Sequence, residues 1–372
     1  MSAYAIYRLP HEDHATLIRQ SAGDPVELRS LTELNGQQGF VVAPFEVKAD
    51  QPVVLIQGAP ERVDLDKKDI DLDNKRSALP LGLSKNRRDI ILRDRNKEAD
   101  YYRVDFANYH AQLEAEKFRK IVLARCADED MPAGVEPMEL FYRACARYPR
   151  LFIALVETPQ SGCWLTATPE ILLDGKGADW RTIALAGTMK LEDDQLDGEG
   201  ESLTWSTKNI QEQRIVATYI TECLEQFTGD FREEGPRTVR AANLVHLRSD
   251  FTFKLDDQQH IGDVLQALHP TPAVCGLPKR EAFQFIVKNE HTPRRYYSGF
   301  MGPLGTDETH LYVSLRCMNI DGTTCHLYAG GGLLKDSTEE QEWQETEAKM
   351  ETMRRLFLDK KRSALPLGLP RT

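Results

Sequence analysis

A glutamate that shares a helical face with apolar residues is the first candidate for chemistry. Glu212 precedes Ile215, Val216, Tyr219 and Ile220 at helical spacing, so all five side chains fall on one stripe. A carboxylate in such a stripe is costly to bury unless it pairs with a cation or binds a metal. The pattern alone favours a position at the edge of the stripe, where the carboxylate reaches water, because glutamate is rarely fully buried.

A second acidic group lies in the pattern of the last helix. Glu342, Glu345 and Lys349 follow one another at i, i+3 and i+7, which places them on one face, and Ser337 or Thr338 can cap the helix. An acidic first turn is also favoured simply by the helix dipole. The alternative is a site for a hard cation such as Mg²⁺, which prefers oxygen ligands.

Four further ionisable residues lie in strand-like runs. Lys120 begins "KIVLAR", where a lysine usually extends to solvent but, if kept inside, could act as a base. Glu170 lies in the apolar run "TATPEILL". His246 and Arg316 each occupy a strand-like run, and Arg316 could bind a carboxylate with both of its terminal nitrogens.

Two further stretches suggest an anion-binding site and a catalytic cysteine, but neither carries the motif that such a site needs. The run Gly330–Gly332 precedes the last helix and could let backbone amides approach an anion, but it has neither a phosphate-loop nor a dinucleotide pattern. Cys275 in "HPTPAVCGLPKRE" has no motif that pairs it with a histidine base. Pro270 and Pro272 stiffen this loop, Gly276 lets it turn, and Cys275 is predicted to be a small structural residue.

Composition limits the class of protein. The chain has 372 residues, 41% hydrophobic and 28% charged, which is typical of a globular enzyme. Its net charge of −11 argues against a nucleic-acid surface. No apolar run reaches the ~18 residues of a membrane helix, and no secretory signal is apparent. Seven cysteines without a CxxC or CxxH pair argue against a zinc site or disulfides and fit the cytoplasm.

The elements that must hold these residues predict an α+β fold. Many strand-like runs joined by short turns, with a few long helices, favour large antiparallel β-sheets flanked by helices in a single large domain over residues 1–360. A charged loop over 61–100 should lead into a helix near 99–118. The segment "KRSALPLGL" occurs at 75–83 and at 361–369, and residues 361–372 are expected to form a tail without a catalytic role.

Several motifs together resemble one enzyme family. The runs "KIVLAR", "TATPEILL", "LAGT", "LVHL", "LHPTPAVCGLPK", "VSLRC", "YAGGG" and "EWQETEAKM" are similar, in order, to those of the chorismate-utilising enzymes, and most to the isochorismate synthases of menaquinone and siderophore biosynthesis. The resemblance covers residues 100–357, and residues 1–100 match only loosely. It implies one α+β domain with an Mg²⁺-containing cleft and chorismate as the substrate.

The resemblance also implies roles for single residues. Lys120 corresponds to the general base that activates water at C2, and Glu170 to the general acid that protonates the leaving C4 hydroxyl. Glu212 and Glu345 correspond to the metal ligands, and Glu342 to a nearby acid that acts through water. The positions that match the family's substrate-binding residues are Gly187, Thr188, His246, Ala273, Arg316, Gly330 and Lys349.

Two positions discriminate among reactions within the resemblance. Lys120 argues against an ammonia-using member, and Ala273, where members that also release pyruvate tend to carry threonine, favours a synthase that stops at isochorismate. The alternatives are a salicylate-forming or ammonia-using enzyme and, in another class, a non-catalytic binding protein. The stretch "STKNIQEQRIV" around Glu212 departs from the charge-rich pattern of relatives. We expect the menaquinone pathway, given the short N-terminal region, and a monomer.

Overall fold

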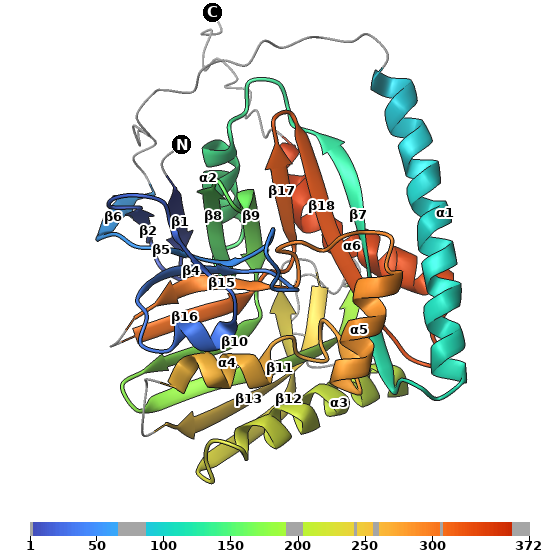
Figure 1. Ribbon diagram of the computed structural model, residues 1–372. Helices are drawn as coiled ribbons and strands as arrows, with labels where there is room; N and C mark the ends of the chain where they lie inside the picture. The colour runs from blue at the N-terminus through green and yellow to red at the C-terminus, as the bar shows by residue number, and fades with distance from the viewer. Residues whose placement is uncertain are drawn as a thin grey trace, which may run out of the picture.

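The computed structural model describes residues 3–65, 87–190, 204–241, 244–255, 260–305 and 308–358. Both copies of the repeated segment and the predicted tail lie outside these residues. Figure 1 shows two β-sheets whose strands run across each other, with helices on their outer faces. The structure confirms the α+β fold with large antiparallel sheets, while the division into a domain and a tail stays a prediction.

Within the described residues, the first sheet has nine strands, all paired antiparallel. In spatial order these are β14 (Gly276–Leu277), β7 (Lys120–Asp130), β18 (Thr324–Leu333), β17 (Cys317–Asp321), β9 (Gly162–Thr168), β8 (Phe152–Thr158), β1 (Tyr4–Arg8), β2 (His14–Arg19) and β6 (Pro60–Asp64).

The second sheet, again counted over the described part of the chain, also has nine antiparallel strands. Their order is β12 (Phe231–Ala241), β13 (Leu244–Lys254), β11 (Asp179–Lys190), β10 (Ile171–Lys176), β16 (Glu308–Val313), β15 (Phe300–Leu304), β4 (Gly39–Ala43), β5 (Val53–Ile56) and β3 (Val26–Leu28). Expected runs such as "HLYVSLRCMNI" therefore split between two strands, and here between the two sheets.

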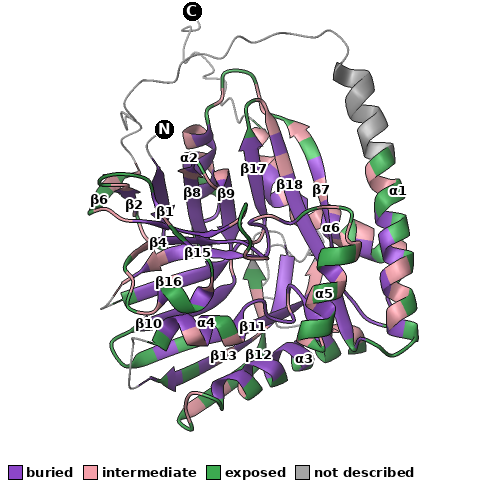
Figure 2. Cartoon of the chain, viewed as in Figure 1, coloured by how far each residue is buried: buried purple, intermediate pink, exposed green. Residues whose placement is uncertain are grey.

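The two sheets face each other across a shared apolar core. Phe152 of the first sheet stacks on Tyr312 of the second with ring centroids 4.2 Å apart, and both rings are buried. Trp164 and Phe40 extend the same core from β9 and β4. Since neighbouring residues of a strand point to opposite faces, the other face of each sheet needs its own cover, and Figure 2 shows the strands largely buried.

Helices provide that cover. The described residues form α1 (Arg87–Glu114), α2 (Pro137–Arg147), α3 (Thr207–Leu224), α4 (Ile261–Leu268), α5 (Lys279–Asn289) and α6 (Glu339–Phe357), with a short 3₁₀ turn at Leu31–Leu34. Apolar residues of α2 and α6 pack on the first sheet, and those of α3 and α4 on the second. Helices α1 and α5 pack on β7. None of these helices is long and apolar enough to cross a bilayer.

The structure differs from the expected helices at two places. Helix α1 begins at Arg87, well before the expected residue 99, because the charged run is rich in helix formers, and it ends before Glu116, which has a positive φ of 57°. Helix α2 was not predicted. Pro137 in its first turn and the buried pair Leu140 and Ala144 at i and i+4 were the available signals.

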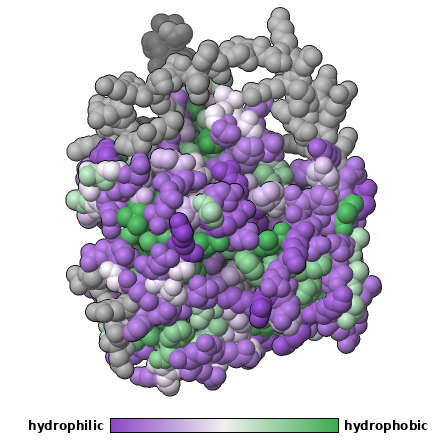
Figure 3. Space-filling view, in the orientation of Figure 1, coloured by the Kyte–Doolittle hydropathy of each residue, from purple (hydrophilic) through white to green (hydrophobic). Residues whose placement is uncertain are grey.

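The surface in Figure 3 is mostly hydrophilic, with short hydrophobic patches across the middle of this face.

Candidate active site

An ion pair at the start of β7 is the centre of the site. Lys120 is fully buried and its Nζ lies 2.8 Å from Oε1 of Glu212 on α3. The expected edge position of Glu212 was wrong: the side chain is buried because α3 packs its apolar stripe on β11. The Gly187 amide also donates to Glu212 Oε2 at 3.2 Å. Burial alone would raise the pKa of Glu212, but the Lys120 ammonium holds it below its usual value.

A second buried carboxyl, that of Glu170, has a pKa shifted in the opposite direction to that of Glu212. Glu170 lies in the turn between β9 and β10, not within a strand as expected, since Pro169 interrupts the run. Its amide donates to Thr168 Oγ1 at 3.2 Å. Burial raises the pKa of Glu170 to about 8, against the opposing field of Lys120. This carboxyl is therefore protonated at neutral pH and can donate a proton.

The glycine run lies in β18, the strand that precedes the last helix. Its residues pair in register with β7, but Gly330 O accepts a hydrogen bond from Lys349 Nζ, so not all of their backbone groups serve the sheet. A Cβ on Gly332 would lie 2.2 Å from Glu212 Oε1, and one on Gly331 would lie 2.7 Å from Glu342 Oε2. A Cβ on Gly330 would lie 2.7 Å from the Tyr297 hydroxyl. The glycines thus make room for the charged groups of the site.

Helix α6 contributes two acids and a lysine on one face, as its spacing predicts. Glu345 and Lys349 form an ion pair of 2.7 Å, and Lys349 Nζ also donates to Gly330 O at 2.8 Å. Glu342 is buried and accepts hydrogen bonds from Lys208 Nζ and, at 2.8 Å, from Ser337 Oγ. Burial, followed by the nearby charge of Glu345, raises the pKa of Glu342 to about 7.

A bulge in β11 presents the opposite wall. The register of β11 against β13 shifts at Gly187, which has a positive φ of 73°, and Thr188 then pairs with His246. His246 Nδ1 lies 3.1 Å from Gly187 O, and its Nε2 contacts Arg316 Nη2. Burial and the charge of Arg316 hold the pKa of His246 well below its usual value. A neutral ring that donates from Nδ1 to Gly187 O and accepts from Arg316 satisfies both contacts.

Arg316 is held in an unfavourable backbone conformation. Its φ is 46°, in the left-handed region that non-glycine residues rarely adopt, at the turn between β16 and β17. The side chain is buried, and burial lowers its pKa to about 10. Such strain persists where the surrounding structure requires one orientation of the residue. At Arg316, this orientation directs the guanidinium at a cavity between the two sheets.

These groups converge on one cavity between the sheets. Most of the predicted site residues line it, and Lys120 and Glu345 pair with two that do, Glu212 and Lys349. Glu342 pairs with Lys208, and neither of these two residues is part of the lining. Lys208 and Tyr297 were missed, although a lysine one helical turn before Glu212 was a usable signal. The predicted residues that line the cavity are Glu170, Gly187, Thr188, Glu212, His246, Ala273, Arg316, Gly330 and Lys349.

The carboxylates of the site fit a hard divalent cation. Glu212, Glu342 and Glu345 all act on the charge of Lys208, so these acids from α3 and α6 lie around one point. Glu342 Oε2 is buried and accepts no hydrogen bond from the described residues. Carboxylate oxygens are the ligands that Mg²⁺ prefers. Glu212, Glu342 and Glu345 together therefore offer carboxylate oxygens that suit such an ion, and Glu342 Oε2 is the buried oxygen among them that accepts no hydrogen bond from the described residues.

The cysteine loop has no catalytic geometry. Cys275 is fully buried, and its Sγ lies 3.9 Å from the backbone oxygen of Lys279. Burial raises the pKa of this thiol to about 12, so it is not a thiolate at neutral pH. Ala273, three residues from the cis peptide bond at Pro270, is the loop residue that faces the cavity with Val274.

The fold and the site together place the chain in a class. The structure is similar to that of MenF, the menaquinone-specific isochorismate synthase from Escherichia coli, with a TM-score of 0.77, 23% identity and coverage of 96% of this chain and 89% of that one. This likeness concerns the fold. Residues 55–358 match the sequence profile of the chorismate binding enzymes, and the chain belongs to that family.

Curated relatives are more similar in sequence over a shorter length. The isochorismate synthase EntC of Escherichia coli is 30% identical over 242 residues, 64% of this chain and 62% of that protein. The isochorismate synthase MenF of the same organism is 32% identical over 240 residues, 64% of this chain and 56% of that protein. The matched region thus spans about 60% of the length of these relatives.

Proposed function

We propose that the protein is an isochorismate synthase, which converts chorismate to isochorismate. The observation that carries the proposal is the combination of a carboxyl that stays protonated at neutral pH, Glu170, with a fully buried lysine, Lys120, beside one cavity. The reaction needs one group that accepts a proton and one that donates a proton. The names of the relatives EntC and MenF support the same activity.

Proton balance assigns the two roles. Lys120, once its ammonium has passed a proton to solvent, takes a proton from the water that adds to C2 of the ring. Glu170 gives its proton to the C4 hydroxyl, which departs as water, because hydroxide is a poor leaving group. One water enters and one leaves, so the net reaction is an isomerisation. Lys120 is confined by its contact with Glu212, and Glu170 by the turn between β9 and β10.

The remaining charges orient the substrate. Mg²⁺ held by Glu212 and Glu345, with Glu342 nearby, would neutralise the ring carboxylate of chorismate. Arg316 and Lys349 supply fixed positive charge at the cavity wall, which explains how a chain with a net charge of −11 can bind a dianion. His246, as a neutral ring, lies against Arg316 and keeps its guanidinium in place.

Product analysis tests the proposal. The purified full chain is incubated with chorismate, with and without Mg²⁺, and products are separated by chromatography. Isochorismate as the main product, formed only with the metal, is the expected result. Salicylate with pyruvate, an aminated product in the presence of ammonia, or no turnover would overturn it. In the first case the chain is a lyase, and in the last it is a binding protein.

Ala273 provides a sharper test of product choice. It contributes a methyl group to the cavity, so Ala273→Thr adds a hydroxyl at the position proposed to control pyruvate release. Pyruvate, measured by a coupled dehydrogenase, should increase relative to isochorismate, whereas Ala273→Val, which adds bulk without a hydroxyl, should not increase it. Equal pyruvate from both variants would remove Ala273 from this role.

The cellular role is a separate proposal. We infer the menaquinone pathway, so loss of the gene should lower menaquinone and leave siderophore secretion unchanged. A siderophore defect with normal menaquinone would reverse the assignment. The monomeric state and the cytoplasmic location stay predictions, to be checked by light scattering and by fractionation of cells.

A further inference from the structure

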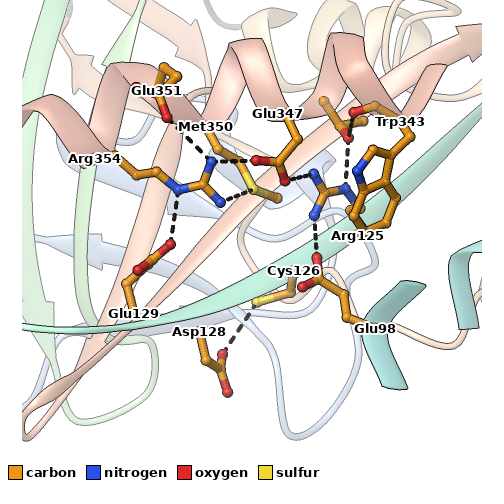
Figure 4. Close-up of polar contacts among 11 residues, drawn as sticks. Glu98, Arg125, Cys126, Asp128, Glu129, Trp343, Glu347, Met350, Glu351 and Arg354 are labelled. Carbon is orange, nitrogen blue, oxygen red and sulfur yellow. Dashed lines mark hydrogen bonds and ion pairs between the residues drawn. The ribbon is translucent and has the colours of Figure 1, made fainter. Parts of the chain in front are cut away.

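A cluster of three different metal-binding side chains lies at the other end of β7. Cys126 and Asp128 are two residues apart on this strand, so they point to the same face, and His326 pairs directly with Asp128 from β18. The ligand atoms Sγ, Oδ1 and an imidazole nitrogen all lie within 4.8 Å of one another. The cysteine and the aspartate point toward each other on the side of β7 away from Arg125 (Figure 4).

The distances suit a small transition-metal ion. Cys126 Sγ lies 3.9 Å from Asp128 Oδ1, and His326 Nδ1 lies 2.6 Å from the same oxygen. In a tetrahedral zinc site, bonds of about 2.0–2.3 Å place ligand atoms about 3.3–3.6 Å apart. The Sγ–Oδ1 separation is close to this value. The histidine and aspartate must separate by less than about 1 Å, which small side-chain rotations allow because neither is fully buried.

Charge and rigidity favour a cation at this place. Burial raises the pKa of the Cys126 thiol, so a metal ion must displace its proton, and Asp128 and Glu98 add the negative potential that favours such an ion. Asp321 adds negative potential at His326, where Arg295 acts in the opposite sense. Cys126 and Asp128 pair with Tyr328 and His326 of β18, and His326 also pairs with Asn319 of β17, so the sheet fixes the backbone that carries the ligands. Asp128 is exposed, which gives an ion access from solvent and leaves a coordination position for water.

We propose that Cys126, Asp128 and His326 form a second metal site, which binds Zn²⁺ or a similar borderline-soft divalent ion. Binding replaces the thiol hydrogen with the metal, and the proton passes to solvent. The site is separate from the proposed magnesium carboxylates, because six residues of extended strand, about 20 Å, separate Cys126 from Lys120. Its nearest link to the cavity is Tyr328, which pairs with Cys126 and lines the cavity.

Co²⁺ binding tests the proposal independently of catalysis. The reduced full chain, in excess Mg²⁺, is titrated with Co²⁺, and the near-ultraviolet absorption of a thiolate–Co²⁺ bond is followed. No cysteine is among the proposed magnesium ligands, so this band reports only a thiolate site. We expect one Co²⁺ per chain and its displacement by Zn²⁺. Absence of the band in the unaltered protein would overturn the proposal.

Matched variants identify the ligands. Cys126→Ser should abolish the band, and His326→Gln should weaken Co²⁺ binding by about tenfold or more, since one of three protein ligands is lost. His14→Gln is the control, because His14 also contacts an aspartate, Asp13 at 3.0 Å, on the exposed surface. A band that survives Cys126→Ser would refute the site. If that variant does not fold, the exposed Asp128→Asn supplies the same comparison, with unchanged binding as the contrary result.

Discussion

Two clusters of charged side chains contact β7, and they differ in how completely their charges are paired. The active-site cluster comprises Lys120, Glu170, Glu212, Glu342, Glu345, Lys208 and Lys349. The Arg125 network comprises Arg125, Arg354, Glu98, Glu129 and Glu347. Both lie at or near the junction of β7 or β18 with α6, and both contain buried guanidinium or ammonium groups.

The Arg125 network is internally complete. Arg125 pairs with Glu98 and Glu347, donates to Thr346 Oγ1 at 2.7 Å, and lies 3.7 Å from the centre of the Trp343 ring (Figure 4). Arg354 forms ion pairs with Glu347 at 2.6 Å and with Glu129 at 2.9 Å, and so connects these two acids. Hydrogen bonds from these arginines hold the pKa of Glu347 below its usual value despite burial. These groups tie α1, β7 and α6 together.

In the active-site cluster, Glu342 pairs with Lys208, but the described residues form no ion pair with Glu170. Burial raises the pKa of Glu170 to about 8 and that of Glu342 to about 7, so two acids stay poised near neutral pH. Groups of this kind are expensive for stability and are typical of functional sites. A buried acid that forms no ion pair with the described residues, Glu170, therefore distinguishes the active-site cluster from the Arg125 network, where Glu98 and Glu347 both pair with Arg125.

The largest expected effect is on catalysis when Lys120 is removed. Lys120→Ala should lower kcat/KM by about 10³-fold, within the usual contribution of a general base. The unfolding midpoint should be measured in parallel, since Glu212 loses its buried partner. Lys335→Ala, at an exposed ion pair, is the control and should leave kcat/KM unchanged. Normal turnover by Lys120→Ala would exclude the proposed base.

In the Arg125 network, by contrast, a substitution should lower stability and leave kcat nearly unchanged. Arg125→Met should lower the free energy of unfolding by about 3 kcal/mol, because it leaves Glu98 and Glu347 without their partner in a largely buried place. Denaturant titration measures this change. Below the denaturation range, kcat should stay within about twofold of the original, since no member of this network lines the cavity. A large loss of kcat in the folded variant would show that the two clusters are coupled.

The pH dependence should report Glu170. A general acid works only while protonated, so a pKa of about 8 predicts full activity below that pH and a loss of about tenfold per pH unit above it. Initial rates of isochorismate formation across the alkaline range measure this limb. Glu170→Gln should remove most of the activity at every pH. A rate that stays constant well above pH 8 would assign the proton to another group.

The smallest effect is expected at an exposed ion pair. Arg19 donates to both carboxylate oxygens of Glu61, at 2.9 and 3.0 Å, and both side chains are partly exposed. Arg19→Met should change the free energy of unfolding by less than about 1 kcal/mol, because water screens the pair. The same denaturant titration gives the value. A loss as large as that of Arg125→Met would mean that burial does not distinguish these pairs.

Much of the fold follows from local sequence patterns. Apolar runs such as "LFIALVE" are strands because β-branched and aromatic residues fill both faces of a covered sheet. The helices that hold Glu212 and Glu345 follow from their spacing. Ser206 caps the first, whereas Thr338, at the start of the second, makes no side-chain capping hydrogen bond. Helix α2 was missed and α1 was misplaced, since their boundaries depend on packing and on a left-handed residue at Glu116.

The site was harder to predict from local patterns. Its residues were named through resemblance to a family, while the burial of Glu212 and the contact of Lys208 with Glu342 depend on how α3 and α6 pack. The spacing of the cysteines argued against any zinc site, because it reveals only ligands that are close in sequence. His326 lies 198 residues from Asp128 along the chain and meets it only through the pairing of β18 with β7.

The glycine run of β18 has a consequence for sequence variation. A single methyl group on Gly332 would collide with the carboxylate of Glu212, so even alanine should be selected against there. At Gly229 a methyl group would meet no atom within 4 Å, so this position should accept alanine freely. In a library of variants, the positions of β18 that accept a larger residue should therefore be those with no charged side chain close beside them. Sequence divergence in this strand then records the shape of the cavity.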